Sequence, residues 1–439
     1  MEWISPIVFI ILLGITGFLF ARQVNIIRHN ISMGKKVPNE GPKSERIRQM
    51  LLVAFGQQKM FKNFIPAILH LFVYVGFILI NIEVLEIIID GIFGTHRIFA
   101  PFIGGSYAAF ISFFEILAVA VLLSCVLFIV RRHFLKVKRF TAREMSGWPK
   151  LDALIILVVE IVLMGAILLM NAADLQLQEM GAAGYAQTGN YLVSQFIAPI
   201  FSGMSESALV VVERTAWWAH IVGIFAFLNY IPYSKHLHIF LAFPNTYYGR
   251  LQPKGEMNNM PEITNEVKGM LDLPVDESAS DEVPDSFGAK DVDQLSRKNL
   301  LDAYSCTECG RCTAACPANI TGKLLSPRKI MMDTRDRAEE LGRQRLSQKD
   351  PKFDDGKSLL GDYITDEELN ACTTCNACVE ACPVLINPLE IILQLRRYNI
   401  MEASKAPNEW NIMFGNIENN QAPWAFPADD RMKWAEEDA

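Results

Sequence analysis

Five long apolar runs constrain this chain more than any other feature of its sequence. They occupy residues 4–21, 64–89, 98–130, 151–170 and 209–241. A helix rises about 1.5 Å per residue, so roughly 20 residues cross a bilayer core about 30 Å thick. We therefore predict five transmembrane helices in an all-α protein. A content of 51% hydrophobic and only 20% charged residues over 439 residues argues against an ordinary soluble enzyme.

The rest of the chain, after about residue 245, is charged and rich in turn-forming residues. This change in composition predicts a membrane half and a water-soluble half. The net charge of -7 excludes a dominantly basic nucleic-acid binder. The first apolar run is unlike a cleaved signal peptide, because Arg22 and Arg28 follow the run instead of preceding it. We expect this run to remain as a helix.

Lysine and arginine are shared unevenly between the loops. The loops 22–63 and 131–150 are strongly basic, whereas the alternate loops carry mainly carboxylates, with Arg97 and Arg214. Cytoplasmic loops keep an excess of Lys and Arg. We therefore predict a protein of a prokaryotic cytoplasmic membrane, in contact with its lipid. Its amino terminus lies outside and its carboxyl-terminal half lies in the cytoplasm.

Eight of the nine cysteines form two copies of the pattern C-x2-C-x2-C-x3-C-P. In this pattern three close thiolates bind one iron-sulfur cube, and the fourth cysteine binds the other cube. We predict one 4Fe-4S cluster on Cys306, Cys309, Cys312 and Cys382. We predict the other on Cys372, Cys375, Cys378 and Cys316. Two zinc sites are the competing interpretation, which the repeated gap and the following proline disfavour. Thiolates clustered in this way indicate a reducing compartment.

The distance between the two cysteine patterns predicts a helical domain. Sixty-six residues separate Cys306 from Cys372, too many for two adjoining ferredoxin repeats, and the insert contains helical stretches. The predicted division is a transmembrane domain 1–248, a linker 249–290, a ferredoxin domain 291–402 and a tail 403–439. The tail, with Trp410, Trp424 and Trp434, is either a docking segment for a partner or a disordered end.

Four of the seven histidines lie in or beside the apolar runs: His70, His220, His236 and His238. His220 and His238 are 18 residues apart, or five helical turns, so they are predicted on one helix face about 27 Å apart. His236 is predicted on the opposite face. Two histidines on one stripe and a third on another helix suit b-type haem, whose iron takes an axial nitrogen from each side. Histidines that pack the bundle through hydrogen bonds are the alternative.

The stretch from His220 to Ile239 resembles the last helix of the nitrate reductase gamma subunit family, in which two histidines stand 18 apart around a similar Pro-aromatic-Ser-basic run. In that family the second helix supplies two further ligands ten residues apart. His70 matches the first of these, but Ile80 occupies the second position. The resemblance implies a five-helix cytochrome b domain.

The same resemblance implies a haem b on the cytoplasmic side, held by His70 and His238. A second, outer haem would keep only His220 as a ligand. His96 could fold back as its partner, the outer site could be empty, or His220 could face His70. One haem, or two, is therefore expected.

The cysteine half resembles the helical ferredoxin domain of succinate dehydrogenase iron-sulfur subunits, and more closely the C-type subunit of heterodisulfide reductase. The fusion of both halves is similar to membrane iron-sulfur oxidoreductases that serve electron-transfer flavoprotein, sulfite reduction or heterodisulfide. Members of those groups often carry cysteine-rich CCG repeats, which this chain lacks. The resemblance therefore implies a separate cytoplasmic catalytic subunit of the CCG-repeat type, or a flavoprotein donor.

The remaining chemistry-bearing residues are few. Glu115 and Glu160 are expected as buried carboxylates that either pack against polar groups or serve protons and quinone. Cys125 is interpreted as a small buried hydrophobe. No nucleotide-binding loop, flavin fingerprint or substrate-cleaving triad is present. The chain is thus expected to lack a complete catalytic site of its own.

These observations predict a membrane-bound electron-transfer subunit of a respiratory oxidoreductase. Single electrons would pass between a cytoplasmic partner and the quinone pool through two 4Fe-4S clusters and b-type haem, with the favoured direction into menaquinone. A member of a heterodisulfide-reductase-like or sulfite-reduction complex is the alternative within this class. A redox sensor that uses the clusters is the alternative from another class.

Overall fold

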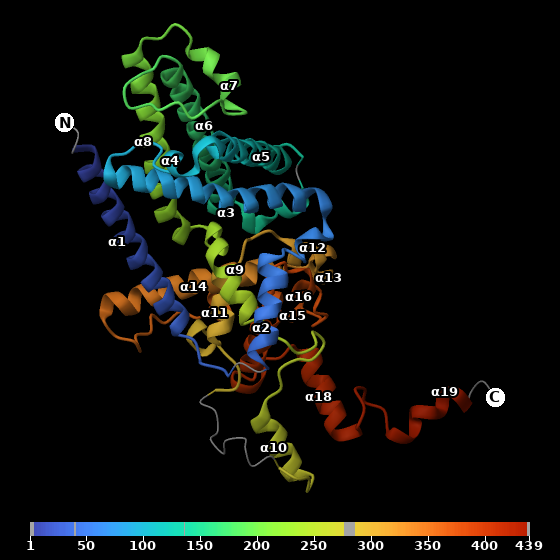
Figure 1. Ribbon diagram of the computed structural model, residues 1–439. Coiled ribbons are helices and arrows are strands. Elements are labelled where there is room, and N and C mark those ends of the chain that lie inside the picture. The colour runs from blue at the N-terminus through green and yellow to red at the C-terminus, as the bar shows by residue number, and fades with distance from the viewer. Residues whose placement is uncertain (1–3, 39–40, 136, 276–285, 437–439) are drawn as a thin grey trace.

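The computed structural model describes residues 4–38, 41–135, 137–275 and 286–436. Within these residues the chain is helical, and its only β contacts are isolated bridges between Lys35 and Ser296 and between Leu360 and Ile364. The predicted all-α fold is confirmed. The helices form a membrane-type bundle that is followed by a compact helical domain (Figure 1).

Five helices of the described chain are long and apolar enough to cross a membrane. They are α1 (Ile4–Ser32), α3 (Phe64–Phe93), α5 (Tyr107–His133), α6 (Trp148–Glu179) and α8 (Glu206–Tyr230). The short helices between them are α2 (Lys43–Met50), α4 (Ala100–Ile103) and α7 (Ser194–Ile197), with single turns at Leu51–Phe55, Met60–Lys62, Gly104–Ser106, Lys138–Phe140, Arg143–Met145 and Ala198–Phe201. The number of predicted spans is confirmed.

The bundle packs around α6, which lies between α5 and α8, while α3 lies on α5 and α1 lies against α3 and α8. Phe9 of α1 is fully buried, and its ring centroid lies 5.7 Å from those of Trp217 and Phe225. A side chain at Gly91 would place its Cβ within 2.7 Å of the Phe9 ring, so glycine allows α1 and α3 to approach closely there.

The last apolar run is not one helix, so the prediction for residues 209–241 was wrong. After α8 the chain makes two short turns, Ile231–Tyr233 and Lys235–Leu237, and restarts as α9 (His238–Tyr247). Pro232 lacks an amide hydrogen, and Ser234 is extended, with φ -115° and ψ 154°. The predicted stripe that joins His220 to His238 over five continuous turns therefore does not exist.

The carboxylate of Asp152 in α6 stabilises this break. It accepts hydrogen bonds from the Tyr230 hydroxyl at 2.5 Å, the Ser234 hydroxyl at 2.6 Å and the Lys235 amide at 3.1 Å. The last of these bonds satisfies a backbone amide that a continuous helix would have paired within itself. A residue about 80 positions earlier in the chain thus fixes where the last membrane helix ends.

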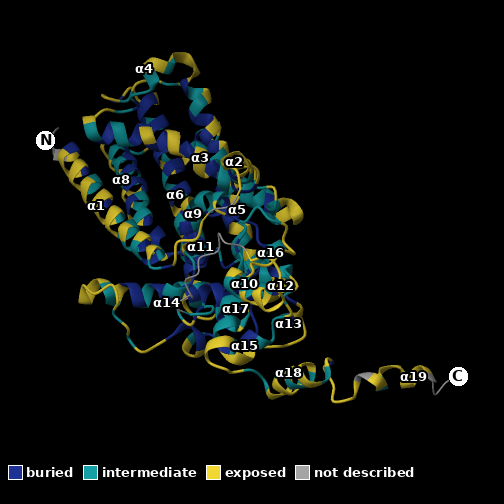
Figure 2. Cartoon of the chain, turned by 90° about the horizontal axis from the view of Figure 1, so that it is seen from below, coloured by how far each residue is buried: buried dark blue, intermediate teal, exposed yellow. Residues whose placement is uncertain are grey.

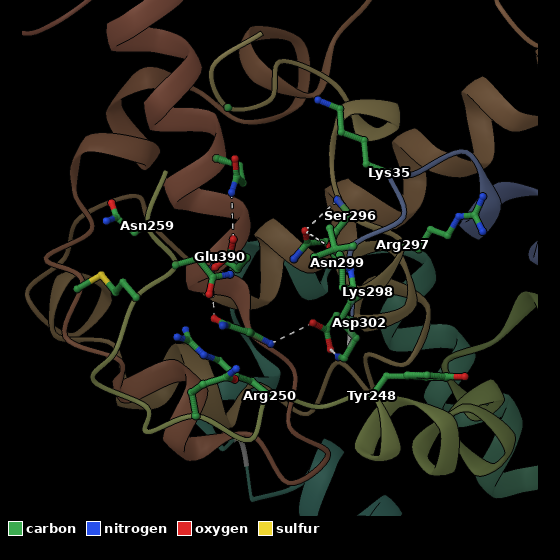
Figure 3. Close-up of a pocket in the computed structure, with 18 of the residues that line it drawn as sticks. Lys35, Tyr248, Arg250, Asn259, Ser296, Arg297, Lys298, Asn299, Asp302 and Glu390 are labelled. Atoms are coloured by element: carbon green, nitrogen blue, oxygen red, sulfur yellow. Dashed lines mark hydrogen bonds and ion pairs between the residues drawn. The ribbon is translucent and has the colours of Figure 1, made fainter. Parts of the chain in front are cut away.

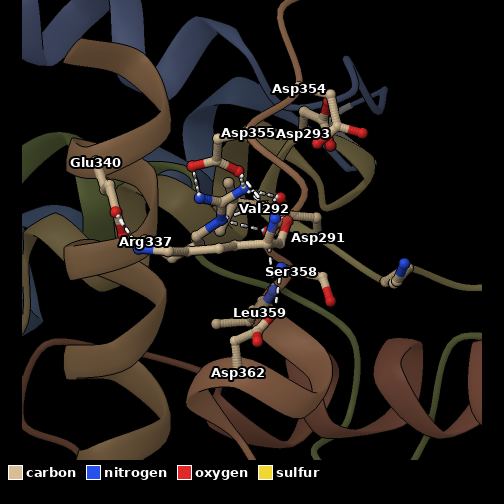
Figure 4. A network of polar contacts seen from close by, with 12 residues as sticks. Asp291, Val292, Asp293, Arg337, Glu340, Asp354, Asp355, Ser358, Leu359 and Asp362 are labelled. Carbon is tan, nitrogen blue, oxygen red and sulfur yellow. Dashed lines mark hydrogen bonds and ion pairs between the residues drawn. The ribbon is translucent and has the colours of Figure 1, made fainter. Parts of the chain in front are cut away.

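The cysteine-bearing domain is built from short helices around one long helix. They are α11 (Arg297–Tyr304), α12 (Arg311–Ala315), α13 (Pro317–Ile320), α14 (Pro327–Gln348), α15 (Asp366–Asn370), α16 (Ala377–Ala381) and α17 (Pro388–Arg397), with turns at Val292–Gln294, Leu359–Tyr363 and Tyr398–Glu402. The buried Arg337 of α14 binds Asp291 at 2.6 Å and Asp355 at 2.7 Å (Figure 4). This pairing fastens the segments before α11 and after α14 to the long helix.

The two halves share one hydrophobic core. Ile27 of α1, Ile156 of α6 and Phe227 of α8 belong to the same buried cluster as Leu300 and Ile330 of the cysteine domain. The backbone of Lys35 also exchanges hydrogen bonds with residues 295 and 297, at 2.7 and 2.9 Å. The cysteine domain therefore lies against the ends of the helices that the basic loops connect.

Two segments lie apart from this body. Helix α10 (Pro261–Met270) belongs to the predicted linker, of which residues 276–285 lie outside the described residues. Helices α18 (Asn408–Asn420) and α19 (Lys433–Glu436), with a turn at Ala428–Met432 between them, form a tail that extends away from the body, and many of its residues are exposed (Figure 2). The predicted domain limits remain a prediction.

Candidate functional site

The first cysteine loop forms a cavity together with the end of the second. Cys306 and Cys309 lie between α11 and α12, Cys312 lies in the first turn of α12, and Cys382 follows α16. These four cysteines line one small cavity, together with apolar groups that include Met331 and Ile386. The fourth cysteine of the second pattern therefore meets the first three cysteines of the first pattern.

The two cysteine loops repeat the same backbone. Glu308 and Gly310 have positive φ values of 52° and 70°, and the equivalent Thr374 and Asn376 have values of 54° and 60°. Residues with side chains rarely adopt this conformation. Each loop then enters a short helix, and these two helices, α12 and α16, pack on each other. Two equivalent half-sites thus face one another.

The neighbours of the thiols follow the same crossed arrangement. Burial, and then the thiols of Cys372 and Cys316, raise the pKa of Cys378 to about 12. Burial, and then Cys309, raise the pKa of Cys382 to about 11. Because a thiolate is the metal-binding form, a cation bound here would have to displace these protons.

The cysteine sulfurs of the described residues are not gathered around a single-ion site, and two of them already accept backbone hydrogen bonds. Within the described ranges, no three Cys, His, Asp or Glu side chains are placed to hold one metal ion. A zinc ion with ligands about 2.3 Å away would need sulfur atoms within roughly 4 Å of one another. Amide groups of Thr374 and Ile386 already donate to the sulfurs of Cys372 and Cys382, at 3.4 and 3.3 Å.

Glu308, inside the first cysteine loop, connects this loop to the membrane half. It is 3% exposed and forms ion pairs with Lys235, in the break after α8, and with Arg335 of α14 at 3.0 Å. Burial alone would raise the pKa of Glu308, but the charges of Arg335 and Lys235 hold this pKa below its ordinary value. Sequence reasoning missed this connection, for which the sequence carries no local signal.

Two imidazoles, those of His236 and His238, meet at the same end of the bundle, and His70 is near enough to act on His236 electrostatically. Burial, and then the rings of His238 and His70, lower the pKa of His236 to about 3. The His236 and His238 ring centroids are 5.6 Å apart. Nδ1 of His238 lies 2.9 Å from the Lys235 carbonyl oxygen, which leaves Nε2 available. Metal-ligating histidines usually engage their second nitrogen in this way.

His220 has a similar arrangement deeper in the bundle. Its Nδ1 lies 2.9 Å from the Leu163 carbonyl oxygen, and its buried Nε2 has no hydrogen-bond partner among the described residues. His96 lies elsewhere, with Nε2 3.7 Å from Asp174 and its ring against Tyr185. Helix α3, which carries His70, packs on α1 and α5, whereas α8, which carries His220, packs on α1 and α6.

The two carboxylates singled out from the sequence differ in their surroundings. Glu115 accepts hydrogen bonds from Asn171 and from the amides of Val193, at 2.8 Å, and Ser194. This pattern suits a packing role at the start of α7. Glu160 is 9% exposed, lies near the buried Cys125, and makes no hydrogen bond within the described part of the chain.

Arg97 forms a buried polar cluster that sequence analysis treated as loop charge. Its guanidinium contacts Asp174 at 2.9 Å, Asn171 at 2.6 Å and Glu83 at 3.7 Å. Glu83 lies within α3 and, at 2% exposed, is as deeply buried as Glu86 one turn later. The three-residue spacing of these carboxylates on one helix face was the available signal.

Comparison with known proteins supports an electron-transfer role. Residues 305–386 match the family described as 4Fe-4S dicluster domain. The chain is 28% identical to the probable iron-sulfur-binding oxidoreductase FadF of Bacillus subtilis and 26% identical to the EtfAB:quinone oxidoreductase of Syntrophomonas wolfei, in both cases over 99% of this chain. It spans 61% and 60% of the lengths of these relatives.

A further similarity is confined to part of the chain. The C-type subunit of the CoB-CoM heterodisulfide reductase of Methanosarcina acetivorans is 33% identical over 26% of this chain and 56% of that protein. No solved structure matches the chain. Together, the family match and the relatives support 4Fe-4S clusters, oxidoreductase chemistry and membrane anchoring.

Proposed function

We propose that this chain carries single electrons between a cytoplasmic donor and the quinone pool of a prokaryotic cytoplasmic membrane. The contact that carries the proposal is the buried pair between Glu308, in the first cysteine loop, and Lys235, whose carbonyl oxygen holds His238. This contact joins the proposed cluster site directly to the proposed haem site. Iron-sulfur clusters and haem, when bound, each exchange one electron at a time.

The proposed cluster ligands follow the crossed arrangement. Cys306, Cys309, Cys312 and Cys382 would hold the first cluster. Cys372, Cys375, Cys378 and Cys316 would hold the second. The shared cavity supports the first set, and the neighbours of Cys378 support the second. Apolar groups such as Met331 and Ile386 keep water from the first site.

The surroundings of the two loops support an order for the clusters. Arg311 of the first loop donates to the carbonyl oxygen of Lys59, just before α3, at 3.3 Å, and α12 packs on the turn after α5. In the second pattern Glu380 of α16 also pairs with Lys62 before α3, but the carbonyl oxygen of Cys372 accepts from Arg396 of the same domain, and Cys375 is exposed. The first cluster would therefore lie nearer the membrane and the second nearer the donor.

The proposed haem b ligands on the cytoplasmic side are His70 and His238. The contact of His238 Nδ1 with a carbonyl oxygen would fix its ring with Nε2 free for iron. His220 has the same kind of contact, and its Nε2, unpartnered among the described residues, would suit a second haem. This membrane half would then be a cytochrome b domain like that of the nitrate reductase gamma subunit family.

Two further observations support the acceptor and the orientation. One relative that aligns over 99% of this chain is named EtfAB:quinone oxidoreductase, so we propose menaquinone as acceptor and a flavoprotein, or a CCG-repeat subunit, as partner. The cysteine domain packs against the basic loops through pairs such as Arg328 with Glu144, at 2.7 Å. Because basic loops stay inside, this end would face the cytoplasm.

Membership of a heterodisulfide-reductase-like complex is the second candidate function. The observation that favours it is the 33% identity of the cluster region to the C-type subunit of a heterodisulfide reductase. Identification of the chain that co-purifies with this protein separates the two functions. A redox sensor, in contrast, would bind clusters without reducing quinone.

The proposal is tested with the intact chain in detergent micelles. Reduced methyl viologen serves as donor and a soluble menaquinone analogue as acceptor, while absorbance follows b-type haem. We expect His70→Ala and His238→Ala to abolish the low-spin signal of the cytoplasmic-side haem and to abolish quinone reduction, whereas His96→Ala retains that signal. Retention of every haem signal in His70→Ala removes His70 as a ligand. Failure of the unaltered protein to reduce the quinone overturns the proposed electron transfer to quinone.

A further inference from the structure

A large open groove lies on the surface of the cysteine domain. The stretch of chain that follows α9 forms one of its walls. Its volume is about 1020 Å³. Its walls come from segments far apart in the sequence, including the residues after α1, the stretch 248–262, helix α11 and the start of α17 (Figure 3). The proposed function assigns nothing to this groove.

Positive charge dominates the lining. The basic side chains are Lys35, Lys36, Arg46, Arg250, Lys254, Arg297, Lys298 and Arg397, and the acidic ones are Glu256, Glu262, Asp302 and Glu390. Asp302 is already neutralised by Lys298, at 2.5 Å. A concave surface lined by one sign of charge raises the local concentration of opposite charge.

Several of these cations serve the fold, but three do not. Arg297 donates to the Gly34 carbonyl oxygen at 3.1 Å, and Arg397 donates to that of Asn258. Lys35, Lys36 and Arg250, in contrast, form no ion pair with the described residues, and the buried Nε of Arg250 has no hydrogen-bond partner among them. Their charge remains available to a ligand.

The groove reaches the second cysteine loop. Asn376 and Val379, which flank Cys378, belong to its lining. Cys375, next to Asn376, is exposed. An anionic partner seated in the groove would therefore lie beside the proposed second cluster, on the side where Cys375 is exposed.

We infer that this groove docks an acidic surface of the electron-donating protein and that electrons enter at the second cluster. The inference rests on the proposed function and names the chemistry of its partner. Exposed apolar side chains, Val37 at 59% and Met257 at 42%, lie among the polar groups of the lining, as in protein interfaces. The neighbouring α10 lies at the end of the molecule opposite α7, which favours a protein over lipid (Figure 1).

The test compares two double variants of the full chain. Lys35→Glu with Arg250→Glu reverses the free charges of the groove, and Lys323→Glu with Arg343→Glu makes the same change outside its lining. Quinone reduction is measured with reduced electron-transferring flavoprotein and, separately, with reduced methyl viologen, a small cation that needs no docking.

We expect the groove variant to lower kcat/KM for the flavoprotein by about tenfold at low salt, with unchanged viologen rates and an unaffected control variant. Added salt should remove the difference between the unaltered chain and the groove variant. Equal flavoprotein rates in the two double variants overturn the inference. If the unaltered chain accepts electrons from viologen but not from flavoprotein, the flavoprotein is not the donor. Binding of an acidic peptide to the groove then tests whether the groove is a docking site.

Binding is measured with a fluorescent polyglutamate peptide, with polyglutamine as its control. We expect the unaltered chain, but not the groove variant, to bind polyglutamate. Absence of binding to the unaltered chain overturns the docking site. Nanodiscs of phosphatidylcholine and of phosphatidylglycerol test a lipid ligand. If the groove variant is slower only in the anionic phosphatidylglycerol discs, the groove binds lipid headgroups and the inference is overturned.

Discussion

Lys235 and Glu308 form a buried ion pair that links the break after the last membrane helix to the loop between the first two cysteines. Lys235 is 8% exposed and Glu308 is 3% exposed. Arg335 contacts the same carboxylate at 3.0 Å, and Asp152 lies 3.6 Å from the Lys235 ammonium. Because each charge has partners from another element, the membrane half and the cysteine domain are held as one unit at this point.

Loss of the Lys235 charge should loosen this junction. Lys235→Met leaves Asp152 and Glu308 with fewer positive partners, which should cost about 3 kcal/mol of stability. Arg48→Met removes a charge from the exposed pair with Glu45 and should change stability little. Thermal unfolding in detergent, followed by circular dichroism, compares the two. Equal midpoints would show that the buried pair contributes nothing.

Asn376 should be sensitive to the shape of its replacement, since its φ is 60°. Asn376→Gly keeps this conformation accessible, whereas Asn376→Val imposes a strain of roughly 1–2 kcal/mol on the second cysteine loop. We expect the valine variant to lose iron and acid-labile sulfide from one cluster, and the glycine variant to keep both. Full iron content in Asn376→Val would contradict the assigned loop geometry.

Gly342 allows α14 to contact α1. A Cβ at this position would lie 2.7 Å from the side-chain Cγ of Asn30. The Nδ2 group of Asn30 donates a hydrogen bond to the Tyr304 hydroxyl at 2.8 Å. Gly342→Ala should therefore lower stability by about 1–2 kcal/mol. Gly415→Ala, with open space around it, is the control, and Asn30→Ala should rescue the Gly342→Ala protein. Thermal unfolding midpoints compare these variants. If adding Asn30→Ala does not raise the midpoint of the Gly342→Ala protein, the close contact is refuted.

Arg97 should be essential for the fold of the end of the bundle away from the cysteine domain. Arg97→Met leaves Asp174 and Glu83 without the guanidinium that they share, at an expected cost of about 3–5 kcal/mol. Arg143→Met, in the opposite loop, should be nearly neutral. The measurements are the yield of folded protein and its unfolding temperature. A stable Arg97→Met protein would mean that these carboxylates do not depend on the cation.

Sequence alone predicts those features that depend on local pattern. The length of the apolar runs sets the number of spans, and the cysteine spacing implies crossed cluster ligation. The break at Ser234 was missed because it depends on Asp152, which comes from another helix. The partners of Arg97 and the basic groove were missed for the same reason, since both are built from segments distant in the sequence.

The central claim is that this chain holds two 4Fe-4S clusters beside a membrane-embedded haem. Its most direct test is the iron, sulfide and haem content of the intact chain, purified in detergent without air. We expect about eight non-haem irons and about eight acid-labile sulfides per chain, with at least one b-type haem. A colourless protein that contains no iron would contradict the account.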